Sequence, residues 1–186
     1  DTCPPAPVLL TDATNNDPLF WHALYWYDQV GGLQDMCEGP AELCFTSADL
    51  CSGADVDIRY LLFLDLDNDG IQESVVNSTH LFNANTVFFN NAGNANYGGG
   101  LPRRFDERPV PINQQYGFSI QTTTDGNKKT ACVRWRTQSQ PLNFVTPQLP
   151  YGTHRIRWFA TDKCGNETTC EYIFTIQNSS GVCGGA

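Results

Sequence analysis

The stretch HRIRWFATDKCGNETTCEYIFTIQ, residues 154–177, carries the clearest structural signal in this chain. In its first half, Ile156, Trp158 and Ala160 alternate with Arg155 and Arg157. Apolar side chains fall on every second position of its last seven residues as well. Because successive side chains of a strand point to opposite faces, this alternation predicts two β-strands, each with one face against a core.

Earlier stretches extend the pattern. YGFSIQTTT (116–124) and TACVRWRT (130–137) flank the turn residues Asp125-Gly126-Asn127, which predicts a hairpin. VDIRYLLFL (56–64) is almost continuously apolar, so we expect a strand buried on both faces. Residues 91–115 predict a long loop rich in Asn, Gly, Pro and Arg.

Taken together, these stretches predict an all-β chain built as an Ig-like antiparallel β-sandwich with long loops. We expect residues 1–54 to form an N-terminal extension and a Cys-rich loop that is pinned by disulfides onto the sandwich. Within it, residues 31–54 are expected to be irregular. Residues 55–178 would form the sandwich and residues 179–186 a flexible tail.

Composition restricts the function. Hydrophobic residues make up 40% of the 186, so a core can be buried, and the formal net charge is -9. An acidic surface repels phosphates and anionic lipids, so we expect no nucleic acid partner. No segment approaches the roughly 20 apolar residues of a membrane span, so membrane insertion is not expected. The first residues lack a signal peptide's basic and apolar regions, so if the protein is secreted we expect this chain to be its mature or excised form.

The chain contains eight cysteines without the short paired spacings of zinc sites, which favours disulfides in an oxidising, extracellular setting. The disulfide candidates are Cys3, Cys37, Cys44, Cys51, Cys132, Cys164, Cys170 and Cys183. Three Asn-x-Ser/Thr sequons make Asn77, Asn166 and Asn178 glycosylation candidates.

Residues 149–176, LPYGTHRIRWFATDKCGNETTCEYIFTI, resemble the closing half of hyalin-repeat (HYR) modules. The shared pattern is a Gly-x-His turn, a Trp-bearing strand, Asp-x-Cys-Gly-Asn, and a Cys before the last aromatic strand. The block from residue 55 to this segment resembles a larger variant found in long, multi-repeat secreted surface proteins of Bacteroidota bacteria. The resemblance implies an extracellular adhesion or scaffold module that is not an enzyme. It also implies a Cys170–Cys3 disulfide, although a local Cys164–Cys170 bond is equally buildable.

One loop has metal-ligand spacing. In Asp65-Leu66-Asp67-Asn68-Asp69-Gly70-Ile71-Gln72-Glu73, carboxylates at alternate positions converge when the chain wraps around a cation. The predicted structural Ca²⁺ ligands are the side chains of Asp65, Asp67, Asp69 and Glu73 and the backbone carbonyl of Ile71. The loop is not an EF-hand, since its twelfth position is Val76. The alternative is a solvated Asp/Asn/Gly turn.

Other polar and aromatic groups are expected to be structural. The three histidines, His22, His80 and His154, are far apart in the sequence and indicate packing roles. A salt-bridged surface patch is expected from Arg103, Arg104, Asp106, Glu107 and Arg108. Core packing or a buried interface is expected of Phe20, Trp21, Tyr25, Trp26 and Tyr27, with a carbohydrate-stacking platform as the alternative.

The predicted function is therefore non-enzymatic. We expect a structural module at the cell surface, either a repeat of a giant surface protein or a subunit of an extracellular filament. Its partners would be copies of itself or neighbouring repeats, and the apolar start around Val8-Leu9-Leu10 could add as a strand to an adjacent subunit. The alternative is an adhesin module that binds glycans or cell-surface proteins. A small hydrolase is the least favoured, because no nucleophile–base pair is visible.

Overall fold

The computed structural model describes residues 26–28, 34–35, 37–50, 52–66, 68–72, 74–78, 103–106 and 110–177. Over these residues the chain is all-β, with one short 3-10 turn at Ile112–Gln114 and no α-helix. In chain order the strands are β1 (Trp26–Asp28), β2 (Gln34–Asp35), β3 (Glu38–Pro40), β4 (Cys44–Ala48), β5 (Asp57–Leu64), β6 (Ser74–Asn77), β7 (Arg103–Phe105), β8 (Tyr116–Asp125), β9 (Lys128–Thr137), β10 (Gln148–Pro150), β11 (Gly152–Thr161) and β12 (Glu167–Ile176).

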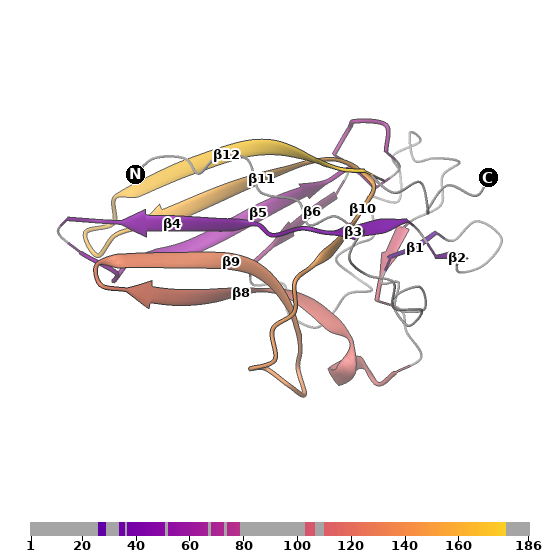
Figure 1. Ribbon diagram of the computed structural model, residues 1–186, viewed down its shortest axis with the longest axis horizontal. Coiled ribbons are helices and arrows are strands. Elements are labelled where there is room, and N and C mark those ends of the chain that lie inside the picture. The colour runs from indigo at the N-terminus through magenta and orange to yellow at the C-terminus, as the bar shows by residue number, and fades with distance from the viewer. Residues whose placement is uncertain are drawn as a thin grey trace.

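Two antiparallel sheets form the body of the molecule (Figure 1). The larger has the order β12-β11-β5-β6 and the smaller the order β4-β9-β8. Their long strands run side by side along the long axis in Figure 1, and the short pairings of β1, β2 and β7 and of β3 with β10 gather at one end. The predicted all-β, antiparallel architecture is confirmed in this form.

Both predicted hairpins are present. Strands β8 and β9 pair along their whole length, from Tyr116–Thr137 to Asp125–Lys128, and β11 and β12 pair from Gly152–Ile176 to Thr161–Glu167. Each hairpin turns at a glycine with positive φ, +59° at Gly126 and +86° at Gly165. Residues with side chains rarely adopt this conformation, so the glycines explain why the chain reverses at these points.

A single core joins the two sheets. Ile156, Trp158 and Ala160 of β11 are buried on one face, as their alternation predicted. Trp158 stacks on Phe45 of the other sheet, with ring centroids 5.9 Å apart. The Tyr60 hydroxyl donates across the core to the Ser119 carbonyl at 2.9 Å. Each large apolar side chain buried in this way contributes roughly 1.5–3 kcal/mol.

A cluster of aromatic side chains around Phe105 lies at one end of the core. The Phe105 ring lies 4.9 Å from Trp26, 4.7 Å from Trp135 and 5.4 Å from Phe118. Trp26 is fully buried, and its indole N–H donates to the Gln148 carbonyl at 2.8 Å. The core-packing prediction for Trp26 is therefore confirmed, whereas the side chains of Phe20, Trp21, Tyr25 and Tyr27 lie outside the described residues.

Two expectations need correction. Residues 31–54 contain β3 and β4, and β4 pairs with β9 along five positions. Phe45 and Leu43 are buried, so this segment supplies core, and the expected division at residue 54 falls between strands of the two sheets. Strand β5 is not buried on both faces, because its residues alternate between buried and partly or fully exposed. On the outward side of β5, the Arg155 guanidinium carbon lies 3.9 Å from the centroid of the Phe63 ring.

Candidate functional site

The DxDxDG loop is organised around Asp65, whose side chain is fully buried. Its Oδ1 accepts a hydrogen bond from the Asp69 amide at 3.2 Å. Its Oδ2 accepts from the amides of Gly70 at 3.0 Å and Thr153 at 2.8 Å. Asp65 therefore holds the β5–β6 turn closed and ties it to the start of β11.

His154 forms two further buried hydrogen bonds next to this contact between the β5–β6 turn and β11. Its Nδ1 accepts from the Asp65 amide at 3.1 Å, and its Nε2–H donates to the Pro150 carbonyl at 2.7 Å. Because both ring nitrogens are used, the ring is neutral, and burial lowers the pKa of His154. This arrangement agrees with the packing role expected of it; His22 and His80 lie outside the described residues.

The remaining predicted calcium ligands are only partly described. Asp69 is at the surface of the turn, where its Oδ1 accepts from the Ile71 amide at 2.8 Å. Ile71 is 58% exposed, and Asp67 and Glu73 lie outside the described residues. A carboxylate offers about four lone-pair positions, and three of those on Asp65 receive amides. Asp65 therefore has little capacity left for a cation, and coordination would depend mainly on the other ligands.

Of the five cysteines in the described ranges, four are disulfide-bonded and one is free. Cys44 and Cys132 form a disulfide between directly opposite residues of β4 and β9. Cys37 and Cys170 are disulfide-bonded as well. Cys164 is a free, exposed thiol, so the expectation of a disulfide at this residue is wrong, and with it the local Cys164–Cys170 bond. Cys3, Cys51 and Cys183 lie outside the described residues, as does the Cys170–Cys3 prediction.

The Cys44–Cys132 bond sits on the outer face of its sheet, beside Glu42. Glu42 and the two sulfurs are close enough together to suggest a metal site by residue type. Both sulfurs are consumed by the disulfide, and Glu42 forms an ion pair with Arg134 at 2.5 Å. Metals bind cysteine as the thiolate, so these two sulfurs are not metal ligands in the oxidised protein. The cluster therefore has a structural role.

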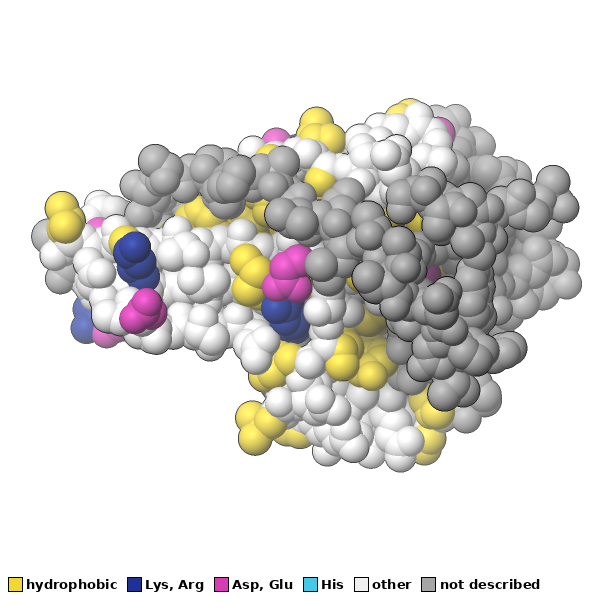
Figure 2. Space-filling view, viewed as in Figure 1, with side chains coloured by type: hydrophobic (Ala, Val, Ile, Leu, Met, Phe, Trp, Pro, Cys, Tyr) yellow, Lys and Arg dark blue, Asp and Glu magenta, His cyan; other side chains and the backbone are white. Residues whose placement is uncertain are grey.

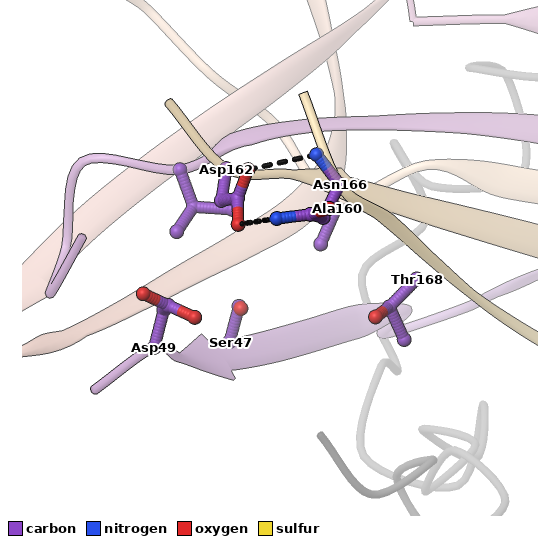
Figure 3. Close-up of a pocket in the computed structure, with 7 residues that line it drawn as sticks. Ser47, Asp49, Ala160, Asp162, Asn166 and Thr168 are labelled. Carbon is purple, nitrogen blue, oxygen red and sulfur yellow. Dashed lines mark hydrogen bonds between the residues drawn. The ribbon is translucent and has the colours of Figure 1, made fainter. Parts of the chain in front are cut away.

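A polar pocket opens at the far end of the sandwich, where β4 approaches the β11–β12 hairpin (Figure 3). Its volume is about 270 Å³, and its polar lining comes from Ser47, Asp49, Asp162, Asn166 and Thr168. Asp162 accepts from the Asn166 amide and side chain, both at 2.8 Å, which lowers the pKa of Asp162. Sequence reasoning missed this pocket because its residues belong to strands of opposite sheets.

The remaining candidates are the sequon asparagines and the predicted salt-bridge patch. Asn166 is an exposed sequon residue whose amide nitrogen donates to Asp162. Asn77 ends β6 and is half-buried, while Asn178 lies outside the described residues. Asp106 is fully buried and accepts from the Tyr116 amide, so its expected position at the surface is wrong. Its neighbours Glu107 and Arg108, and the side chains of Arg103 and Arg104, lie outside the described residues.

Opposite charges lie close together at several places on the described surface. On the side shown in Figure 2, dark-blue (Lys, Arg) and magenta (Asp, Glu) side chains lie beside one another at a few separate places. The described residues on this side form no extended patch of one charge. This arrangement fits isolated ion pairs such as Lys163–Asp55 and Arg134–Glu42. No helix in the described part of the chain has the length and apolar character needed to cross a membrane.

No protein-family model, curated protein or solved structure matches the chain.

Proposed function

We propose that this chain is a non-enzymatic structural module of the cell surface, with an Ig-like sandwich related to hyalin-repeat modules. It acts either as a repeat of a long secreted surface protein or as a subunit of an extracellular filament. The observation that carries this proposal is the Cys44–Cys132 disulfide, together with the bonded Cys37 and Cys170. Disulfides persist in oxidising compartments and are rare in the cytosol, which supports an extracellular location.

The titratable groups with shifted pKa values support a scaffold role. His154 is held between Asp65 and Pro150 inside the core. Asp162 closes the β11–β12 turn, and Glu171 bridges Arg155 and Arg157 on the sheet surface. Shifted pKa values often mark catalytic clefts. Here each of these groups has a structural partner that accounts for its environment.

Calcium is part of the proposal. The loop after β5 makes a tight turn, with φ of +60° at Asn68 and +89° at Gly70. Asp67, Asp69 and Glu73 would supply side-chain oxygens and Ile71 its carbonyl, while Asp65 shapes the turn from within. A bound Ca²⁺ would then stabilise the connection between β5 and β6.

The proposal is tested by electron microscopy of the purified native protein with calcium present. Regular filaments, or ordered arrays of modules, are the expected result. Dispersed single particles under all conditions of concentration and calcium would overturn the filament-subunit role and favour a binding module.

That second candidate, an adhesin module for glycans or cell-surface proteins, is favoured by the pocket in Figure 3. Carboxylates and hydroxyls at the rim of a small cavity are groups that can hydrogen-bond sugar hydroxyls. A glycan array probed with the wild-type chain and with Asp49→Ala separates the two roles. Binding that the variant loses would support an adhesin, and no binding would leave the structural role.

A further inference from the structure

The side chains of β5, β6, β11 and β12 that point away from the core are called the outer face here; among the described residues they are partly or fully exposed. Strand registers arrange these side chains in rows across all four strands. One row contains, in order, Val75, Phe63, Arg155 and Ile173. Val75 is 44% exposed and Ile173 is 61% exposed. This row is apolar except for Arg155, and the exposure of the aliphatic side chains at its two ends indicates a contact surface.

The two neighbouring rows also combine apolar side chains with arginines. The next row contains, in order, Asn77, Leu61, Arg157 and Glu171. The row after it places Arg59 beside Phe159.

Guanidinium groups lie flat on the aromatic rings of this face. The Arg155 guanidinium carbon is 3.9 Å from the centroid of the Phe63 ring, and that of Arg59 is 3.9 Å from the centroid of the Phe159 ring. A planar guanidinium stacked in this way keeps its second side open to another ring.

The outer face is also electrically balanced. Arg59 pairs with Glu167 at 2.8 Å, and Glu171 pairs with Arg155 at 3.1 Å and with Arg157 at 2.5 Å. With Asp57, the described residues of this face carry three arginines and three carboxylates, whereas the whole chain has a net charge of -9. Copies of such a chain repel one another through most of their surface, and a neutral face is where they approach at least cost.

We propose that the outer face is a homodimer interface, with its two-fold axis parallel to the strands and between β5 and β11. This axis sets each row opposite the same row of the second copy, in reverse order. Val75 then meets Ile173 of the second copy, and Phe63 meets Arg155. In the other rows Asn77 meets Glu171, and Arg59 meets Phe159.

The pairs named so far are complementary: aliphatic with aliphatic, ring with guanidinium, and amide with carboxylate. The remaining pair in these rows sets Leu61 against Arg157, whose methylene stem can pack on an aliphatic side chain. A two-fold contact needs such a self-complementary patch, and stacked sheets lie about 10 Å apart, which such side chains can fill. The inference deepens the proposed function and rests on it, since the partner is a second copy of the module.

The test is sedimentation velocity of the full, disulfide-bonded chain over a range of concentrations. The wild type should form a reversible dimer. Val75→Glu and Ile173→Lys should each weaken dimerisation about tenfold or more, because each sets a charge against an aliphatic side chain. The double variant V75E/I173K should recover the dimer, because every new Glu then faces a new Lys. Leu142→Lys is the matched control, since Leu142 is 88% exposed but lies outside the outer face.

Three outcomes would overturn the interface. These are a monomer at every concentration, a dimer that both single variants leave unchanged, and a native protein with a glycan on Asn77, which would block the contact. Filaments in electron microscopy that survive both single variants would refute this interface and leave the structural function standing. A dimer that follows the predicted pattern without filaments would support the interface and count against the filament role alone.

Discussion

At the scale of single residues, Asp65 has a structural role that its spacing did not predict. It was expected to be a calcium ligand, and its buried carboxylate receives three backbone amides, from Asp69, Gly70 and Thr153. The chain packs against it so closely that a Cβ at Gly152 would lie 2.8 Å from the Asp65 carbonyl oxygen. Gly152 is therefore required by the contact, and the two residues together form the joint between the β5–β6 turn and β11.

Replacing this carboxylate should destabilise the protein strongly. Asp65→Ala leaves buried amide donors without an acceptor, and hydrogen bonds to a charged group each contribute roughly 1.5–3 kcal/mol. We expect a loss of at least about 3 kcal/mol in the free energy of unfolding, measured by urea denaturation. Asp57→Ala, at an exposed position of β5, is the control and should change stability little. Equal effects of the two variants would contradict the structural role of Asp65.

Asp162 should make stability depend on pH. Hydrogen bonds from the Asn166 side chain and amide lower the pKa of Asp162 in the folded protein. A lowered carboxyl pKa contributes stability that is present above the unfolded pKa, about 3.9, and is lost as pH falls through the folded value. The difference in melting temperature between wild type and Asp162→Asn should therefore be largest near neutral pH and shrink below about pH 4. A difference that stays constant with pH would contradict this assignment.

At the scale of elements, β4 depends on its disulfide. It is a five-residue strand at the edge of the smaller sheet, paired only with β9 among the described strands. Cys44 and Cys132 face each other in this pairing, and the bond joins residues 88 apart in the sequence. The bond therefore holds a short edge strand in register across a long stretch of chain.

Removing this bond should loosen β4 first. Replacing Cys44 and Cys132 together by Ala is expected to lower the free energy of unfolding by about 2–5 kcal/mol. Hydrogen exchange should speed up in β4 more than in β5 or β11, which belong to the other sheet. Cys164→Ala provides the control, because that exposed thiol is unpaired. Uniformly faster exchange in both sheets would show that the bond acts globally.

At the scale of the whole molecule, stability comes from two sheets that share one core. Phe45 stacking on Trp158 and the hydrogen bond from Tyr60 to Ser119 join them through the middle. The cluster around Phe105 joins them to the short strands at one end. The two sheets are therefore expected to unfold together as a single cooperative unit.

Calcium should stabilise this unit if the β5–β6 loop binds it. A ligand that binds only the folded state raises the melting temperature. We expect Ca²⁺ to raise the melting temperature, EDTA to lower it, and Asp67→Ala to abolish the difference. Differential scanning calorimetry measures all three. A melt that responds to neither Ca²⁺ nor EDTA would refute the calcium proposal.

Local patterns were the most informative part of the sequence. The alternation in residues 154–177 and the glycine turns at Gly126 and Gly165 predicted both long hairpins, because register and reversal depend on neighbouring residues. Strand β4 was missed since its five residues lie between cysteines in a segment that resembles a pinned loop. The burial of Asp106 was missed for a similar reason, because its charged neighbours indicate a surface loop.

The sequence by itself therefore determined the all-β class, the two hairpins and the inward face of β11, all of which follow from alternation and turn chemistry. Only the tertiary structure decided that Cys44 bonds to Cys132, that Asp65 and His154 form one buried joint, and that the rows of the outer face align. These features join residues distant in the chain, and their distances depend on how the sheets pack. Side-chain periodicity sets the face on which a residue lies, whereas packing between strands sets its partner.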